Sequence, residues 1–208
     1  WWWAGQHSSL ATTLAQAARW LHAGQSLQSS GVRGSPRRGG QLDWLRWSRP
    51  GLTVEVRAAR IGWTLAALWQ RTVALGLVQV ASVRITPTPQ PDAPPTKPPA
   101  QWVLPVRVDL PFEIAHIEWA GPAPVQVHAL SGHYRHDLAQ HQLDIHRMEL
   151  AQGQYRAQAT LQAQAPMALQ ATANGQVRAT TPGPGGQALH LSAQAPLHGT
   201  LAPAAAPL

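Results

Sequence analysis

The sequence has no cysteine and, in 208 residues, only one phenylalanine, two tyrosines and two methionines. The missing cysteine excludes disulfide bonds, thiolate metal sites and cysteine nucleophiles. Charged residues make up 12% of the chain, about half of the roughly 25% that is usual for a globular domain. This composition is typical neither of a highly charged disordered tail nor of a helical enzyme.

The positive charge of the chain is spread thinly. The net charge is +7, and sixteen basic residues face nine acidic ones. Their one cluster lies at 32–40, and no groove-entering helix or aromatic RNA-binding motif accompanies it. We therefore expect no nucleic-acid partner.

Motifs for catalysis are also missing. The sequence contains no nucleophile elbow, no phosphate-binding loop and no dinucleotide fingerprint. The glycines and prolines at 182–186 indicate a turn, because no helix pattern follows them. We expect no enzyme activity and no cofactor.

Much of the chain shows a strand pattern with a change of step in its middle. In "VQVASVRI" (78–85) the apolar residues are spaced by two, three and two. The spacing returns in "FEIAHIEW" (112–119) and "LDIHRMEL" (143–150), with a weaker copy at 54–61. A three-residue step keeps one face only if a bulge absorbs the extra residue. We expect bulges at Arg57-Ala58, Ala81-Ser82, Ala115-His116 and His146-Arg147.

These patterns predict a mainly β fold of stacked, bent strands that together form a curved trough. The residues predicted to line its groove are Val78, Val80, Val83, Ile85, Phe112, Ile114, Ile117, Trp119, Leu143, Ile145, Met148 and Leu150. The acids at intervening positions should lie on the outer face; they are Glu55, Glu113, Glu118, Asp144 and Glu149. The apolar face could form an ordinary core or line a lipid groove, and the sequence leaves both open.

The start of the chain has a different character. Trp1, Trp2 and Trp3 are typical of a membrane interface, so residues 1–6 are interpreted as the end of an anchor whose span is missing; a tryptophan-rich start to a soluble domain is the alternative. Residues 7–23 are predicted to form an amphipathic helix that ends at Gly24. Another helical turn or two is expected at 64–71.

Proline divides the remainder. Seven prolines at 87–99 predict an exposed linker over 87–101, between a first groove segment at 24–86 and a second at 102–208 that continues further. "LQAQAPM" (161–167) resembles "LSAQAPL" (191–197), which indicates loosely repeated units.

Histidines gather in the second segment. They are His128, His133, His136, His141 and His146. With no carboxylate at a ligand spacing, they are interpreted as histidines of a surface loop, and we expect no metal site.

The order of these elements resembles the TamB group of the AsmA-like proteins, the inner-membrane partner of the translocation and assembly module. The residues that carry the resemblance are "SSLATTLAQAARWL", "GVRGSPRRGGQLDWLRWSRPGLTVEVRAARIGW", "LAALWQRTVALGLVQVASVRI", the proline-rich break, "LPVRVDLPFEIAHIEWAG" and "HQLDIHRMELAQGQYRAQATLQAQAPMAL". They span nearly the whole chain and would correspond to the N-terminal portion of such a protein.

The resemblance implies a single-pass inner-membrane anchor that faces the periplasm, followed by a long, greasy β-taco. It implies phospholipid transport toward the outer membrane and a role in outer-membrane protein assembly and secretion. The expected partners are phospholipids, the inner membrane and an outer-membrane assembly barrel, the last through a C-terminal region that this chain lacks. A scaffold that pairs strand edges with client proteins, without lipid transport, is the alternative.

Overall fold

The computed structural model describes Ala11 and residues 24–35, 39–63, 72–88, 101–178 and 190–200. Within these ranges every regular element from Gly24 onward is a strand, so the prediction of a mainly β groove is confirmed. Apart from Ala11, the predicted helix at 7–23 lies outside the described residues. So do Trp1, Trp2, Trp3 and the helical turn expected at 64–71.

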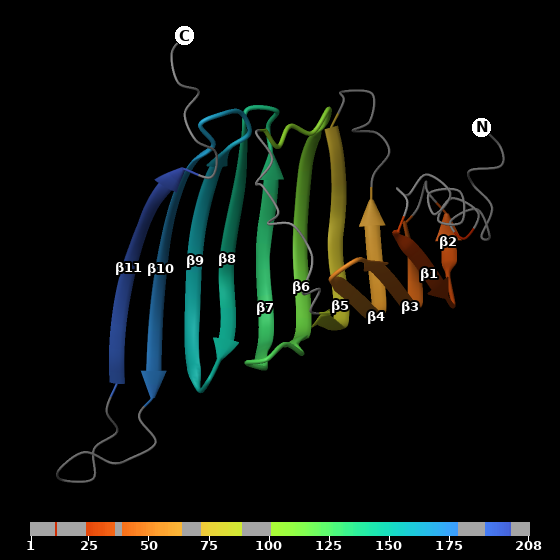
Figure 1. The fold of residues 1–208 in the computed structure, drawn as a ribbon, viewed down its shortest axis with the longest axis horizontal. Coiled ribbons are helices and arrows are strands. Elements are labelled where there is room, and N and C mark those ends of the chain that lie inside the picture. The colour runs from red at the N-terminus through yellow and green to blue at the C-terminus, as the bar shows by residue number, and fades with distance from the viewer. Residues whose placement is uncertain are drawn as a thin grey trace.

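All the described strands belong to one open sheet (Figure 1). Its spatial order follows the chain from β1 to β11, with β2 pairing beside β1 on β3. The strands are β1 (Ser26–Ser30), β2 (Arg33–Ser35), β3 (Gly39–Arg49), β4 (Leu52–Trp63), β5 (Thr72–Pro87), β6 (Arg107–Trp119), β7 (Val125–His136), β8 (Gln140–Leu150), β9 (Gly153–Gln162), β10 (Ala168–Arg178) and β11 (His190–Thr200).

Neighbouring strands are antiparallel except β5 and β6, which are parallel. A parallel pair needs a connection that returns the chain to the starting end of the sheet. The proline-rich segment makes this connection, because β5 ends at Pro87 and β6 begins at Arg107. The two predicted groove segments therefore lie side by side in a single sheet.

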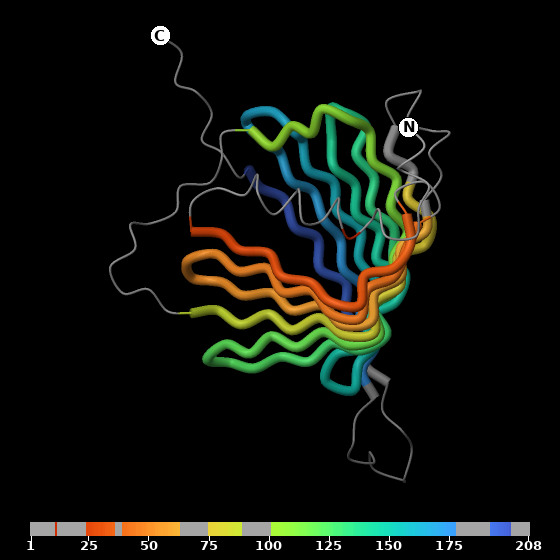
Figure 2. Tube along the Cα trace, turned by 90° about the vertical axis from the view of Figure 1, so that its right-hand side faces the viewer, coloured from red at the N-terminus to blue at the C-terminus, as the bar shows by residue number. Residues whose placement is uncertain are grey.

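A sharp corner runs across the sheet through the middle of its strands (Figure 2). At the corner, each of five successive strands has one residue that is left out of the pairing with the neighbouring strands. These residues lie at the same level of the sheet, opposite one another. They form a row that we call the crease: Asp43, Ala58, Ala81, Ala115 and Ala129. The strands thus divide into two arms, with a concave and a convex face between them.

The crease corrects the predicted bulges in part. A bulge sets two residues of one strand against one residue of its neighbour. In β3 to β7, by contrast, every strand leaves one residue unpaired at the same level, so the numbers of residues on neighbouring strands stay equal. Only at β8 does the predicted form occur, where His146 and Arg147 oppose Arg156. From β9 to β11 the pairing runs without a shift. The corner therefore ends where the alternation of apolar residues becomes regular.

Burial shows which face is concave. Beside the crease, Leu42 and Ala59 are 7% and 4% exposed, whereas Ala58, Ala81 and Ala115 on the crease are exposed. Side chains crowd together inside a corner and spread apart outside it. Leu42 and Ala59, and with them the apolar residues of the same rows, therefore face the concave side.

At one position of the crease the backbone has an unusual conformation, and this can be tested by substitution. Ala58 has a φ of 49°, in the left-handed region, whereas Ala115 in the same row does not have a positive φ. A β-branched residue is strongly disfavoured there, so Ala58→Val should lower the free energy of unfolding by about 1–2 kcal/mol. Ala115→Val, the matched control, should change it little. Urea unfolding measures both, and equal effects would contradict the account of the crease.

One boundary of the linker differs from the sequence-based expectation. Pro87, assigned to the linker, is the last residue of β5 and pairs with Leu52. A proline is accepted there because the end of a strand can do without its N–H. At the other end of the linker, Trp102 donates its backbone N–H to Ala163 at 2.8 Å, so the packed structure begins before β6.

The short sequence repeat is not a structural repeat. "LQAQAPM" forms the end of β9 and the turn after it, whereas "LSAQAPL" lies within β11. Met167 in the turn is 1% exposed, while its counterpart Leu197 is 58% exposed. The interpretation of this similarity as stacked units was therefore wrong.

Candidate functional site

The candidate site is the concave face, which the strand register fills with continuous apolar rows. Opposite residues in a sheet share a face, so the register extends each pattern across the strands. From β3 to β7 the rows are Trp47, Val54, Ile85, Trp119 and Val125; Leu45, Val56, Val83, Ile117 and Val127; Leu42, Ala59, Val80, Ile114 and Leu130; and Gly40, Ile61, Val78, Phe112 and Gly132.

The predicted residues of β8 extend these rows. Ile145 lies opposite Gly132, and Leu150 lies opposite Val127. Met148 lies at the β8 bulge, opposite Tyr155 of β9, and Leu143 pairs with Tyr134. The structure thus brings all twelve predicted groove residues onto one face. Sequence spacing alone missed the contributions of β3 and β7, whose patterns are less regular.

None of the twelve is buried. Eleven are half-buried, and Trp119 is exposed at 39%. The buried hydrophobic residues of the described chain are few: Leu42, Ala59, Leu161, Ala163 and Met167. An ordinary core would bury its large side chains almost completely. In the described part of the chain, most of the concave face is therefore an uncovered apolar surface.

Charge is confined to the convex face in the middle of the sheet. There Arg46, Glu55, Arg84 and Glu118 form an alternating row across β3 to β6. The Arg84 guanidinium lies 3.1 Å from the Glu118 carboxylate, and Arg46 Nε lies 3.7 Å from that of Glu55. Exposed pairs like these add little stability, but they fix which face meets water.

The other predicted outer acids have polar neighbours too. Gln79 donates a hydrogen bond to Glu113 at 3.1 Å, and Arg147 contacts Glu149 at 2.6 Å. Asp144 pairs with His133, which is bonded to Asp109. These acids lie beside polar or basic residues and do not converge as a pair of catalytic carboxylates.

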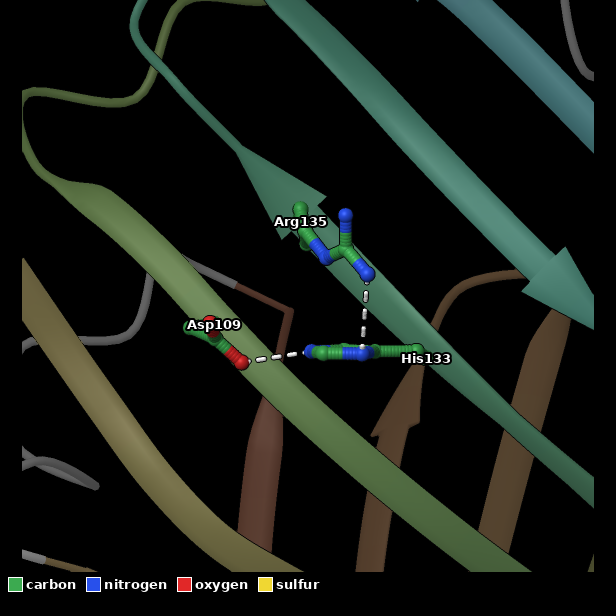
Figure 3. A network of polar contacts seen from close by, with 3 residues as sticks. All are labelled: Asp109, His133 and Arg135. Carbon is green, nitrogen blue, oxygen red and sulfur yellow. Dashed lines mark hydrogen bonds and ion pairs between the residues drawn. The ribbon is translucent and has the colours of Figure 1, made fainter.

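One polar network on this face resembles part of a catalytic arrangement. His133 Nε2 lies 2.5 Å from the Asp109 carboxylate, and Arg135 lies 3.4 Å from His133 Nδ1. Figure 3 shows these side chains on the near side of β6 and β7, with the N-terminal strands behind. Arginine can only donate, so Nδ1 accepts from Arg135 and Nε2–H donates to Asp109. Both imidazole nitrogens are therefore occupied.

One end of the concave face is covered by the segment 101–106, which we call the strap. His141 Nε2 lies 2.6 Å from the carbonyl oxygen of Trp102, and His136 Nδ1 lies 3.0 Å from that of Val106. The Tyr134 hydroxyl lies 2.7 Å from His141 Nδ1. Burial raises the pKa of this Tyr134 hydroxyl, so it stays protonated and available as a donor.

These contacts correct the interpretation of the histidines as residues of a surface loop. His136 and His141 are 2% and 6% exposed, and they lie opposite each other on β7 and β8. Alternation could have placed them, because His136 shares its face with Gly132 and His141 shares its face with Ile145. The hairpin loop is short instead: Asp137 accepts the backbone N–H groups of Gln140 and Ala139, which hold the pKa of its carboxyl below the usual value.

The described residues offer little for a metal site, a catalytic pocket or a membrane-spanning helix. Within the described ranges no three histidines and acids are close enough together to hold a metal ion. A hollow of about 830 Å³ lies beside β8 to β11, and none of its lining residues is acidic. In the same part of the chain no helix is long and apolar enough to cross a bilayer.

Comparison with known proteins adds no identification. No protein-family model, no curated protein and no solved structure matches the chain.

Proposed function

We propose that the chain is a non-enzymatic lipid conduit that carries phospholipid acyl chains along its concave face. The observation that carries this proposal is the set of uncharged rows, mostly half-buried, that run from β3 to β7, two of which continue onto β8. Burying a methylene group contributes about 0.8 kcal/mol, so such a surface would hold an acyl chain. Head groups would stay at the open side, in water.

The geometry also supports movement along the surface. The row of Leu45, Val56, Val83, Ile117 and Val127 repeats similar aliphatic side chains at the spacing of neighbouring strands, about 4.8 Å. An acyl chain that shifts by one strand would therefore exchange one set of contacts for a nearly equal set. Barriers to sliding should be low, and direction would have to come from elsewhere.

The cellular setting is part of the same proposal. By its resemblance to the TamB group, the chain would lie in the periplasm behind a single-pass inner-membrane anchor, with Trp1, Trp2 and Trp3 at the membrane interface. Transport would run toward the outer membrane and would serve outer-membrane protein assembly and secretion with a partner barrel. The proposal needs no cofactor and no enzyme activity.

Lipid extraction tests the conduit directly. The full chain, purified from cells in mild detergent, should retain phospholipid that organic extraction and mass spectrometry can quantify. We expect an amount comparable to that of the protein, since one acyl chain would cover several rows. Lipid at the level of an unrelated control protein would overturn the proposal.

The edge strand β11 favours a second candidate, a scaffold for outer-membrane protein clients. In the described chain β11 pairs with β10 alone, and its residues 192–200 are all exposed. An unpaired edge can accept another strand. Pro196 pairs with Thr172 of β10 although it has no N–H to donate, so its backbone nitrogen faces away from β10. Backbone direction alternates along a strand, so the N–H of Gln194, two residues earlier, also points away from β10.

This parity yields a separate prediction for the scaffold. Gln194→Pro should remove an outward donor without disturbing β10, and client crosslinking to β11 should fall by about tenfold if strand pairing matters. Lipid retention should not change. Ala193→Pro is the control that breaks β10 pairing itself. Unchanged client crosslinking in Gln194→Pro would remove the scaffold from consideration.

A further inference from the structure

The strap is held to the concave face through the two buried histidines. His136 and His141 each reach a backbone carbonyl of the strap, and the Trp102 N–H bonds to Ala163. The two imidazole rings lie 4.4 Å apart, centre to centre. Both rings act as donors toward the strap, so their protonation states bear on its attachment.

The contacts suit neutral rings. His141 donates from Nε2 to Trp102, which leaves Nδ1 to accept from Tyr134. His136 donates from Nδ1 to Val106, and its Nε2 is buried without a partner. A proton added to His136 would go to Nε2, where the new N–H would be buried without an acceptor. The ring would also carry a buried charge.

The two rings differ in how they would receive a proton. The Tyr134 hydroxyl can turn and accept from a protonated His141 Nδ1, so His141 keeps both of its contacts. His136 has no such neighbour among the described residues. Two charged rings at this separation would also repel each other. His136 is therefore the more sensitive member of the pair.

No opposite charge faces the rings from the described elements around them. The residues paired beside them are Val108 on β6 and Leu161 on β9, and Tyr134 on β7 is neutral. The strap itself contains no ionisable side chain. Nearby charged or titratable groups lie on the other face or in the hairpin: Arg107, Asp109, His133, Arg135 and Asp137.

We propose that His136 and His141 form a pH-sensitive latch, which holds the strap on the concave face at neutral pH and releases it when the rings are protonated. Imidazole changes charge near pH 6.5, within about the range from pH 5 to pH 8. Release would remove the strap from the buried residues His141 and Ala163 that Trp102 contacts, and from the neighbourhood of Leu161, which lies opposite His141. The available apolar surface would then grow at that end of the face.

The effect on lipid rests on the proposed function, whereas the release itself does not. Amide hydrogen exchange of the full chain measures release directly, at the Trp102 N–H. After correction for intrinsic rates, its protection should fall about tenfold or more between about pH 8 and about pH 5. The amide of Ile114, in the middle of the sheet, should keep its protection.

Substitutions separate the latch from general acid sensitivity. His136→Asn keeps a donor for Val106 but cannot take up a proton, so protection at Trp102 should become nearly independent of pH. His136→Gln, which also carries an amide donor and cannot take up a proton, serves if the first variant does not fold. His146→Gln, which alters an exposed histidine, should respond like the wild type.

Either of two results would overturn the latch: a wild-type Trp102 protection that does not change with pH, or a full response in the folded His136→Asn variant. Lipid content, measured on the same samples, is a separate readout. A chain without lipid but with pH-dependent exchange at Trp102 would retain the latch and remove the conduit.

Discussion

Replacing Val83 with aspartate is expected to reduce phospholipid binding by about a hundredfold. Val83 lies in the middle of a concave row, between Val56 and Ile117, and is half-buried. A carboxylate among acyl chains costs about 3 kcal/mol, and each 1.4 kcal/mol is about a tenfold change in affinity. Lipid retained after purification, and transfer of labelled lipid between vesicles, both measure the loss.

The neighbouring residue provides a matched control. Ser82 precedes Val83 and lies opposite Arg57 and His116, outside the apolar rows. Ser82→Asp introduces the same charge one residue away, near two groups that favour it, so lipid binding should stay close to that of the wild type. Circular dichroism should show folded sheet in both variants, since neither position is buried. Equal lipid binding by the two variants would contradict a lipid-bearing concave face.

Gly132→Ala is expected to cause a large loss of stability. A methyl group there would collide with the backbone oxygen of Asp144 on β8 and lie 2.8 Å from Cζ of Phe112 on β6. The phenylalanine ring can move, but the oxygen belongs to the paired strand. Overpacking of this kind costs about 1–3 kcal/mol, and the backbone contact favours the upper end. Urea unfolding followed by circular dichroism gives the value.

Gly199 on β11 is the control for this substitution. A methyl group at Gly199 would meet no atom within 4 Å. Gly199→Ala should therefore leave the free energy of unfolding within about 0.5 kcal/mol of the wild type. Similar losses in the two variants would show that the close contact between β6, β7 and β8 at Gly132 does not control stability.

Strand spacing was the most informative signal in the sequence. The two-three-two pattern placed β5, β6 and β8 and put their apolar residues on one face. Side chains alternate strictly within each half of such a strand, and the three-residue step marks the interruption between the halves. It also located the break near Ala58, Ala81 and Ala115. It did not show that these residues would face one another, since register across strands depends on pairing partners that a single strand does not reveal.

The covered end of the face was beyond the reach of local patterns. Trp102 and His141 are far apart in the sequence, and their contact depends on the path that the chain takes between the parallel strands β5 and β6. The histidines suggested a polar loop by their residue type, whereas alternation from Gly132 places His136 on the apolar face. Proline was also overweighted, because Pro87 at a strand end and Pro196 on an edge strand leave the sheet intact.

Photocrosslinking at two adjacent residues tests the lipid-bearing face most directly. A photoreactive amino acid at Ile114 would stand on the concave face, and one at Glu113 would stand on the convex face, beside Gln79. In cells that express the full chain, the conduit predicts a phospholipid adduct at Ile114 and none at Glu113. Crosslinks from Ile114 only to other parts of the chain, with no lipid at either position, would mean that the apolar rows form a closed core and would contradict the proposed function.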